Sequence, residues 1–218
     1  MSIYNNPPPT FIQYDDGVKS LIIRFCQLSD IDMLLEAIDE SIVELRQFLP
    51  WAHSPQTKEK QAERMHKIIS EIGQGGDLYY HFFDGKDHAF LGCVGLHHST
   101  SNNKAFELGY WCRSSRTGEG WTTLVAQCMV VLGLKHLHAE RIQCCYNEAN
   151  MASQRIANKV GFNQEARLKN YETQPNETQK KAGSLIKPYM IMSSIFPEDR
   201  TQLSWYSQIA NHLTIHTS

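Results

Sequence analysis

The sequence predicts a mixed α/β fold, an α+β arrangement in which helices pack on a mixed sheet. Three short runs rich in aromatic and β-branched residues, at residues 78–83, 89–96 and 105–112, are typical of an antiparallel meander. From the third run to residue 196, strand and helix patterns alternate, which indicates a mixed layer. With 218 residues, 41% of them hydrophobic, the chain has room for one full-sized domain and a small appendage.

Composition and charge exclude several kinds of partner. The 21 basic and 23 acidic residues form no long block of one sign, so the chain lacks the electrostatic footprint of a nucleic-acid or lipid-binding protein. No apolar run approaches the roughly 20 residues that span a bilayer, and the start lacks the pattern of a secretory signal. The six cysteines form no CxxC pair. We therefore predict a cytoplasmic protein in a reducing compartment, without nucleic-acid or membrane partners.

The first predicted element is a β-hairpin over residues 11–26. Two apolar arms flank Asp16 and Gly17, a residue pair that favours the tight turn of a hairpin. The preceding residues 1–10 are polar and rich in proline, so we expect them to form a flexible tail.

Two helices are predicted next. Apolar residues recur at helical spacing from Ile31 until Pro50 stops the pattern. Ser29 and Asp32 have the spacing of a capping box, which predicts where this helix begins. A second helix is expected to begin after Thr57 and to end at the glycine-rich run that follows it.

The second half of the chain is predicted to alternate helices and strands. Residues 121–136 carry one apolar helical face, and residues 140–145 have the pattern of a buried strand. A helix near residues 150–159 precedes another strand, and residues 189–196 form the last one. Between these two strands, the polar residues 171–184 are expected to form an exposed loop.

Residues 197–218 are predicted to form a C-terminal amphipathic helix after the domain at residues 11–196. One side of this helix is apolar and consists of Leu203, Tyr206, Ile209, Ala210 and Leu213. This stripe either caps the domain or joins two copies of the chain, and of the two we favour a homodimer.

The loop at residues 113–120 is a candidate binding site. It carries Gly118 and Gly120 directly before the helix that begins at Trp121. Backbone amides in such a turn, at a helix N-terminus, suit a diphosphate, and glycine lets the oxygens approach closely. A plain tight turn is the alternative for this pattern taken alone.

Other motifs accompany this loop in a fixed order. ELGYW precedes it, Arg141 and Ile142 open the next strand, NMAS at residues 150–153 opens a helix, and KVGF at residues 159–162 closes that helix. Upstream, residues 48–57 read FLPWAHSPQT. Together these motifs resemble the GNAT superfamily of acyl-CoA-dependent N-acetyltransferases, in the branch typified by the ribosomal-protein acetyltransferases RimJ and RimL. The resemblance implies the GNAT-like acyl-CoA N-acyltransferase fold, a central twisted, mostly antiparallel sheet flanked by helices.

The resemblance also implies acetyl-CoA as cosubstrate and no metal. The pantetheine arm would pair like an extra strand with backbone groups around Trp111, Cys112 and Arg113. Asn150 would orient pantetheine, cap its helix, or do both. The pyrophosphate would sit on backbone amides of Arg116, Thr117, Gly118, Glu119, Gly120 and Trp121. Ser115 is a departure, because the superfamily often has Gln or Arg at this position.

Four side chains are candidates for the chemistry and the acceptor. Glu107 is the candidate general base, directly or through a water, and a solvent-facing strand glutamate is the alternative. Ser153 stands where family members have a group near the sulfur, so it could protonate the departing thiolate; its alternative is helix capping. Trp51 either lines the acceptor channel or anchors its loop, and Tyr189 either contacts the acceptor or packs.

Histidines and cysteines are assigned no role at this stage. None of the ten histidines shows ligand spacing with a matching partner, so no metal site is predicted. His97 and His98 are adjacent and are expected to point to opposite faces of a strand. An acyl-enzyme on Cys112 is set aside because the family favours direct attack.

We therefore predict an N-acetyltransferase that moves an acetyl group from acetyl-CoA directly to an amine. The acceptor favoured is the N-terminal α-amine of a protein, such as a ribosomal protein, because an α-amine with a pKa of about 7.7–8.0 needs only a weak base. A small amine, such as a polyamine, amino acid or aminoglycoside, is the second hypothesis. A CoA-binding module without catalysis is the third.

Overall fold

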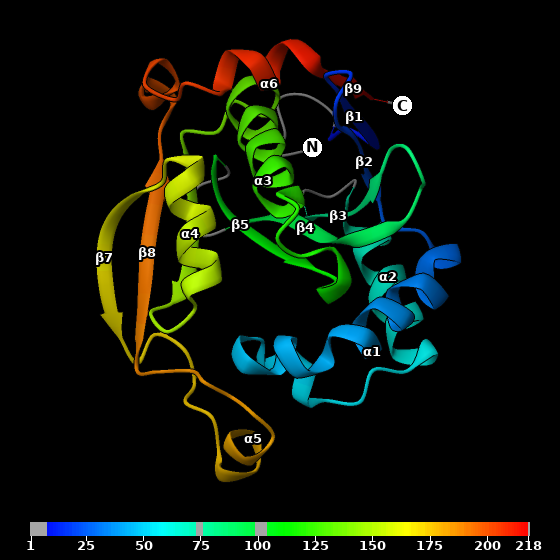
Figure 1. The fold of residues 1–218 in the computed structure, drawn as a ribbon, viewed down its shortest axis with the longest axis vertical. Coiled ribbons are helices and arrows are strands. Elements are labelled where there is room, and N and C mark those ends of the chain that lie inside the picture. Colours follow the sequence, from blue (N-terminus) through cyan, green and yellow to red (C-terminus); the bar gives the residue numbers. More distant parts are fainter. Residues whose placement is uncertain (1–7, 73–75, 99–103, 218) are drawn as a thin grey trace.

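A computed structural model describes residues 8–72, 76–98 and 104–217. Within these residues, nine strands form one sheet in the order β7-β8-β6-β5-β4-β3-β2-β1-β9. Neighbouring strands are antiparallel except for β5 and β6, which are parallel. Helices lie on both faces of this sheet (Figure 1). The predicted mixed α/β fold with a mostly antiparallel sheet is confirmed.

The elements agree closely with the predicted ones over most of the chain. The strands are β1 (Phe11–Asp15), β2 (Ser20–Phe25), β3 (Leu78–Asp84), β4 (Phe90–His98), β5 (Ala105–Cys112), β6 (Arg141–Asn147), β7 (Asn163–Lys169), β8 (Tyr189–Ile195) and β9 (Leu213–His216). The helices are α1 (Ile31–Phe48), α2 (Lys58–Ile72), α3 (Trp121–Val131), α4 (Met151–Val160), α5 (Glu177–Lys181) and α6 (Tyr206–His212).

The expected N-terminal tail is held in place where the structure describes it. The amide of Thr10 donates to the carbonyl of His216 in β9 at 3.1 Å. The hydroxyl of Tyr80 donates to the carbonyl of Pro9 at 3.0 Å. Residues 8–10 are therefore tied to the sheet, and residues 1–7 of the predicted tail lie outside the described residues.

Helix α1 begins near the predicted position but not with the predicted cap. The carboxylate of Asp30, not Asp32, accepts the hydrogen bond of a capping box, from the amide of Gln27 at 2.9 Å. Asp30 is fully buried and also accepts hydrogen bonds from Arg24 and His81. The expected pair of Ser29 and Asp32 is thus wrong, because Asp30 forms three buried contacts that the sequence alone does not show.

The sheet separates two hydrophobic clusters. One lies between the sheet and the helices α3, α4 and α6, and the other between the sheet and α1 and α2. Because side chains alternate along a strand, β5 contributes to both: Phe106 and Leu108 belong to the first cluster, and Trp111 packs against the second. Strand β5 therefore presents different side chains to the two faces.

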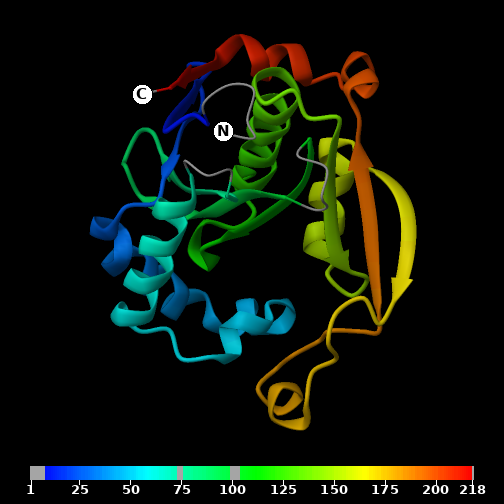
Figure 2. The same ribbon diagram turned by 180° about the vertical axis from the view of Figure 1, so that it is seen from behind.

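Residues 171–184, expected as a loop, contain a short helix. Asn176 caps α5 by accepting a hydrogen bond from the amide of Gln179 at 2.9 Å, and the Gln179 side chain accepts one from the amide of Asn176. This reciprocal cap starts a helix within a polar segment that has no apolar stripe. In Figures 1 and 2, α5 stands away from the sheet at the end of a long connection.

The C-terminal segment corrects the prediction of one helix over residues 197–218. A 3-10 turn at Pro197–Thr201 precedes α6, and β9 then adds an antiparallel strand to the edge of β1. Helix α6 lies across the end of α3 (Figures 1 and 2). The apolar stripe packs against the larger core cluster, with Ile209 buried there. The stripe therefore caps the domain, and the hypothesis of a homodimer loses the observation on which it rested.

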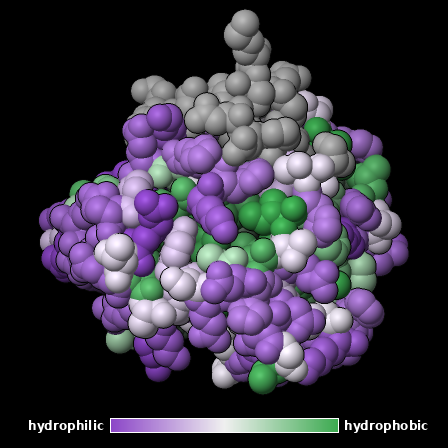
Figure 3. All heavy atoms as spheres, turned by 90° about the horizontal axis from the view of Figure 1, so that it is seen from above, coloured by the Kyte–Doolittle hydropathy of each residue, from purple (hydrophilic) through white to green (hydrophobic). Residues whose placement is uncertain are grey.

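Hydropathy on this end of the molecule agrees with that arrangement. Figure 3 looks down on the end that bears α6, and most described residues on view there are hydrophilic. Hydrophobic residues come to the surface in small, separate areas, because the stripe of α6 is turned inward.

Candidate active site

The sheet opens at the junction between β5 and β6. These strands pair over three residues only, from Ala105 with Arg141 to Glu107 with Gln143. Beyond them, β6 continues along β8 as far as Asn147, while the rest of β5 pairs with β4. The facing edges of β5 and β6 therefore carry backbone groups with which an extended ligand can pair.

A cavity of about 520 Å³ lies at this opening. It is bounded by the end of α1, the end of β5, the loop before α3, and the first turns of α3 and α4. Nine of the predicted site residues line it: Trp111, Cys112, Arg116, Thr117, Gly118, Gly120, Trp121, Asn150 and Ser153. Arg113, Glu119, Glu107, Trp51 and Tyr189 are not among its lining residues.

The loop before α3 has the geometry of an anion cradle. Gly118 and Gly120 have φ angles of +83° and +84°, which favour glycine, and Gly120 is the N-cap of α3. Within the described part of the chain, no group accepts a hydrogen bond from the amides of residues 118–123. The amides of Arg116 and Thr117 donate to carbonyls of the preceding turn. The free amides therefore begin two residues later than predicted and extend further into the helix.

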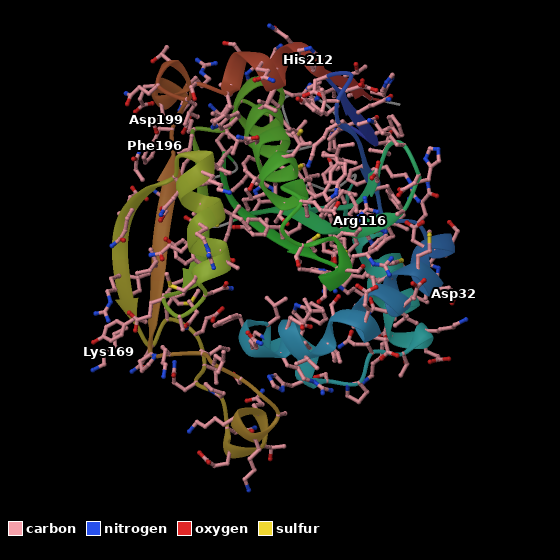
Figure 4. All side chains as sticks on the ribbon, viewed as in Figure 1. Asp32, Arg116, Lys169, Phe196, Asp199 and His212 are labelled. Carbon is pink, nitrogen blue, oxygen red and sulfur yellow. The ribbon has the colours of Figure 1, made fainter. Side chains whose placement is uncertain are left out.

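Arg116 anchors this loop to the turn between β3 and β4. Its guanidinium contacts the carboxylates of Asp84 at 2.6 Å, Asp87 at 3.2 Å and Glu119 at 3.2 Å. Glu119 also accepts a hydrogen bond from the indole of Trp121 at 2.8 Å. Figure 4 shows Arg116 near the middle of the molecule, beside the loop. With three carboxylates around it, this guanidinium holds the loop and leaves anion binding to the backbone amides.

Arg113 fixes the other side of the loop to α1. Its guanidinium donates to Glu36 at 3.0 Å and also to Glu40. Glu40 in turn accepts a hydrogen bond from the amide of Ser115 at 2.8 Å. The hydrogen bond from Arg113 lowers the pKa of Glu40 to about 2, with the Ser115 amide adding to the effect. The carboxylate therefore stays charged, and the cradle is braced from two sides.

The first turn of α4 brings two predicted residues to the cavity. The side chain of Asn150 accepts a hydrogen bond from the amide of Ser153 at 3.0 Å, so Asn150 does cap the helix. Tyr110 lies beside them, with its hydroxyl 3.8 Å from the sulfur of Cys144. Burial raises the pKa of Tyr110 well above its ordinary value, while a hydrogen bond with Ser153 opposes that rise. The phenol therefore stays protonated and available as a donor.

Twelve of the 21 lining residues were not predicted as site residues, and three of these, Tyr110, Arg155 and Lys159, carry polar or charged groups that bear on the chemistry. Tyr110 stands within the ELGYW motif and shares a strand face with Leu108, which was the signal available for it. Arg155 and Lys159 are four residues apart on α4, so both face the cavity. They bring two positive charges to the part of the cavity lined by α4, and their spacing after NMAS could have indicated this.

Glu107 lies on the other face of the sheet, beyond the cavity. It is half-buried and accepts a hydrogen bond from Gln143 at 2.9 Å. The loop after β7 brings Glu172 close to it: burial raises the pKa of Glu172, and the charge of Glu107 raises it further. Two carboxylates therefore face this side, although no acidic cluster was evident in the sequence.

The two residues predicted to contact the acceptor have different surroundings. The ring of Trp51 lies 6.2 Å from that of Trp111, a cavity-lining residue, and both pack against the cluster under α1. Tyr189 lies against Arg167, whose guanidinium is 3.3 Å from its ring centroid. Trp51 is thus next to the cavity while it anchors its loop, and the ring of Tyr189 is engaged in packing.

Thiol and metal chemistry receive no structural support within the described ranges. The six cysteines are free, and burial raises the pKa of Cys112 to about 11. Among the described residues, no group of three or more His, Cys, Asp or Glu side chains is arranged to hold a metal ion.

In the same part of the chain, no helix has the length and apolarity needed to cross a membrane.

The family model of the GNAT acetyltransferase domain matches residues 20–163, which include the opened sheet, the cradle and α4. The chain belongs to the GNAT acetyltransferases. A putative ribosomal N-acetyltransferase, YdaF of Bacillus subtilis, is 23% identical over 158 residues, which are 69% of this chain and 82% of YdaF. Within that family the chain is similar to this relative and to solved structures from the RimJ/RimL branch.

Solved structures of this branch share the fold. RimJ of Mycobacterium smegmatis, in complex with CoA-disulfide, superposes with a TM-score of 0.80 at 18% identity, covering 98% of this chain and 99% of RimJ. A RimL structure, the ribosomal L7/L12 α-N-protein acetyltransferase in complex with CoA, gives a TM-score of 0.72 at 19% identity, covering 84% of this chain and 97% of RimL.

Proposed function

We propose that this GNAT protein transfers an acetyl group from acetyl-CoA to an amine, and that the amine is the N-terminus of a protein. The observation that carries the proposal is the cavity at the opened sheet, with the unpartnered amides of residues 118–123 at one end. Those amides fit a diphosphate, and the free edges of β5 and β6 fit an extended pantetheine arm. Arg155 and Lys159 add positive charge across the cavity, as CoA phosphates require.

Side chains of this protein meet the needs of direct transfer. The amine must lose a proton, and the carboxylate of Glu107 lies on the face of the sheet toward α1 and α2. Because Glu107 is outside the cavity lining, the proton passes first to a water or to another group between them. The departing thiolate needs a proton, and the hydroxyls of Ser153 and Tyr110 both line the cavity. The amine nitrogen bonds to the acetyl carbon, the carbon–sulfur bond breaks, and the products are an amide and free CoA.

A protein N-terminus suits this site for two reasons. An α-amine is partly neutral at pH 7, so a modest proton acceptor suffices. The relative YdaF is named a putative ribosomal N-acetyltransferase, and RimL is named a ribosomal L7/L12 α-N-protein acetyltransferase, which supports the same acceptor class here.

Ligand-dependent thermal melting tests the cofactor. A ligand that binds only the native state at about 100 times its Kd adds about 2.7 kcal/mol, which in a chain of this size raises Tm by roughly 5–10 °C. CoA and acetyl-CoA should both produce such a rise, and pantetheine, which lacks the diphosphate, should produce a smaller one. Absence of a shift at millimolar CoA would contradict the proposal.

A small cationic amine is a second candidate acceptor. The observation in its favour is the proximity of Glu107 and Glu172, whose charges interact on the acceptor side. Release of free CoA should be compared between a panel of peptides with free N-termini and a panel of polyamines, amino acids and aminoglycosides. Turnover restricted to the second panel would replace the protein N-terminus by a small amine as the acceptor.

A further inference from the structure

We propose that His97, held by Asp77, receives the proton that the amine loses. It would act between the cavity and Glu107, on the face of the sheet toward α1 and α2. This inference rests on the proposed transfer to an amine and names the group that receives the amine's proton. It departs from the sequence analysis, which assigned the histidines no role.

The ring of His97 is held by the carboxylate of Asp77, which is held in turn by the backbone of His98. The Nδ1 atom of His97 is 2.9 Å from Oδ2 of Asp77, and the backbone amide of His98 donates to Oδ1 of Asp77 at 2.9 Å. The hydrogen bond from His97 lowers the pKa of Asp77, and the His98 amide adds to this effect despite burial. A charged Asp77 accepts a hydrogen bond from Nδ1–H, which leaves the lone pair on Nε2 free to accept a proton.

The position of Nε2 is set by two glycines. Gly95 of β4 and Gly109 of β5 are paired across the strands, and neither has a side chain to cover the sheet there. Nε2 of His97 lies 2.8 Å from where a Cβ atom would stand on Gly95 and 3.4 Å from the same point on Gly109. The imidazole therefore lies over this pair. A Cβ atom on Gly95 would clash with it, and one on Gly109 would just contact it.

Neither His97 nor Glu107 lines the cavity, but the ring of His97 is displaced along β5 toward it. His97 is paired with Glu107 across the strands, but its ring reaches over Gly109, two residues further along β5. The next residues, Tyr110 and Trp111, line the cavity, whereas Glu107 lies about 13 Å along the strand from Trp111. An amine that enters from the α1 side would meet Nε2 before it reached the carboxylate.

The two groups have complementary roles in this arrangement. Glu107 attracts the ammonium form of the acceptor, and Nε2 of His97 takes one proton from its nitrogen. The neutral nitrogen then bonds to the acetyl carbon and the carbon–sulfur bond breaks. The nitrogen's second proton is lost as the thiolate takes one from the hydroxyls of Ser153 and Tyr110, and the proton on His97 passes to solvent, to which its side chain is 37% exposed. Charged and titratable side chains also face this unit from neighbouring elements: Arg64 on α2, Tyr79 on β3, Cys145 on β6 and Glu172 after β7.

Steady-state CoA release measured from pH 5.5 to 9 tests the proposal. General bases typically contribute 10²–10⁴-fold, so His97→Gln should lower kcat/KM by about 100-fold. In the wild type, kcat/KM should fall toward acidic pH, because a protonated Nε2 accepts no proton. In His97→Gln this part of the pH dependence should vanish, which leaves the dependence of the amine itself near pH 8.

Two further variants separate catalysis from structure. His98→Gln is the matched control, because the ring of His98 is turned to the opposite face, 4.9 Å from that of Phe106, and the variant should keep both rate and profile. Asp77→Asn tests a positioning residue and should move the acidic limb while the rise in Tm with CoA is retained. For each variant, that rise in Tm shows that the cavity remains intact.

The outcomes distinguish this inference from the proposed function. A His97→Gln enzyme with a wild-type rate and profile, beside an inactive Glu107→Gln enzyme, would overturn the role of His97 alone. A wild-type protein that binds CoA but releases none with any amine would overturn the transfer reaction, and the role of His97 with it.

Discussion

The two faces of the sheet beside the cavity are built from different kinds of groups. Toward α3 and α4, the ligand-binding groups are mostly backbone: the amides of residues 118–123 and the free strand edges. Toward α1 and α2, the groups that can act on an acceptor are side chains, Glu107, His97 and Glu172, from three separate elements. Backbone groups depend on local conformation, and grouped side chains depend on tertiary contacts. The first face therefore tolerates sequence change better than the second.

The largest expected effect is a loss of unfolding free energy when the buried carboxylate of Asp30, on the face toward α1 and α2, is removed. Asp30→Ala removes the acceptor of hydrogen bonds from Arg24, His81 and the amide of Gln27, at the start of α1. Breaking a buried pair in this way costs about 3–5 kcal/mol of unfolding free energy. Urea denaturation measures it. Asp32→Ala, two residues away in an exposed pair with Lys58, is the control and should cost at most about 1 kcal/mol.

A smaller effect is expected on the CoA side, where Arg116 braces the loop. Arg116→Ala leaves the nearly buried carboxylate of Asp84 without its partner, which should lower the unfolding free energy by about 2 kcal/mol. Calorimetric titration should also show weaker CoA binding, because uncompensated carboxylates then adjoin the cradle. Arg167→Ala, which breaks an exposed pair with Glu148, is the control. Unchanged CoA affinity in Arg116→Ala would mean that the cradle needs no such brace.

The contribution of backbone conformation can be isolated with a single methyl group. Gly120→Ala forces an L-residue into φ of +84°, at a cost of about 1–2 kcal/mol, so CoA affinity should fall roughly tenfold if the loop relaxes. Gly183→Ala carries a similar strain, at φ of +100° with open space around it, far from the cradle. Both variants should lose stability, and only Gly120→Ala should lose affinity. Equal affinities would contradict a main-chain cradle.

The smallest effect is a pH dependence of stability on the acceptor side. Burial lowers the pKa of His81, against the hydrogen bond to Asp30, so the folded state holds this histidine neutral. Below about pH 6.5, His81 binds a proton in the unfolded chain but not in the folded one, so the unfolding free energy falls as pH falls. Between pH 6.5 and 5.5 the loss from this group is at most about 1 kcal/mol. His81→Phe should remove that part of the slope in urea denaturation.

Asp30 adds a second loss at lower pH. Burial alone would raise its pKa, but hydrogen bonds from His81, Arg24 and the amide of Gln27 outweigh it and leave the pKa far below its usual value. Its contribution is therefore complete above about pH 4 and is lost as pH falls toward the folded-state pKa. A protein whose stability did not change between pH 7 and 3 would contradict both assignments.

Local patterns predicted the elements and the cofactor side of the site. Short runs of aromatic and β-branched residues predicted the meander of β3, β4 and β5, and the pattern around Gly118 and Gly120 predicted the loop before α3, because both depend on neighbours in sequence. Sequence patterns failed where residues distant in sequence determine the contact. The start of α1 is capped through Asp30, which Arg24 and His81 hold, and the apolar stripe around Ile209 packs on the core of the same chain.

The sequence by itself determined the fold class, the order of most elements, the glycine loop and the GNAT family, since hydrophobic periodicity and short motifs are local properties. Only the tertiary structure decided which amides are free, what Arg116 binds and which side chains meet on the acceptor side. The clearest example is His97. The adjacent His98 is the same residue type, but only the ring of His97 lies over the paired glycines Gly95 and Gly109, where no side chain covers the sheet.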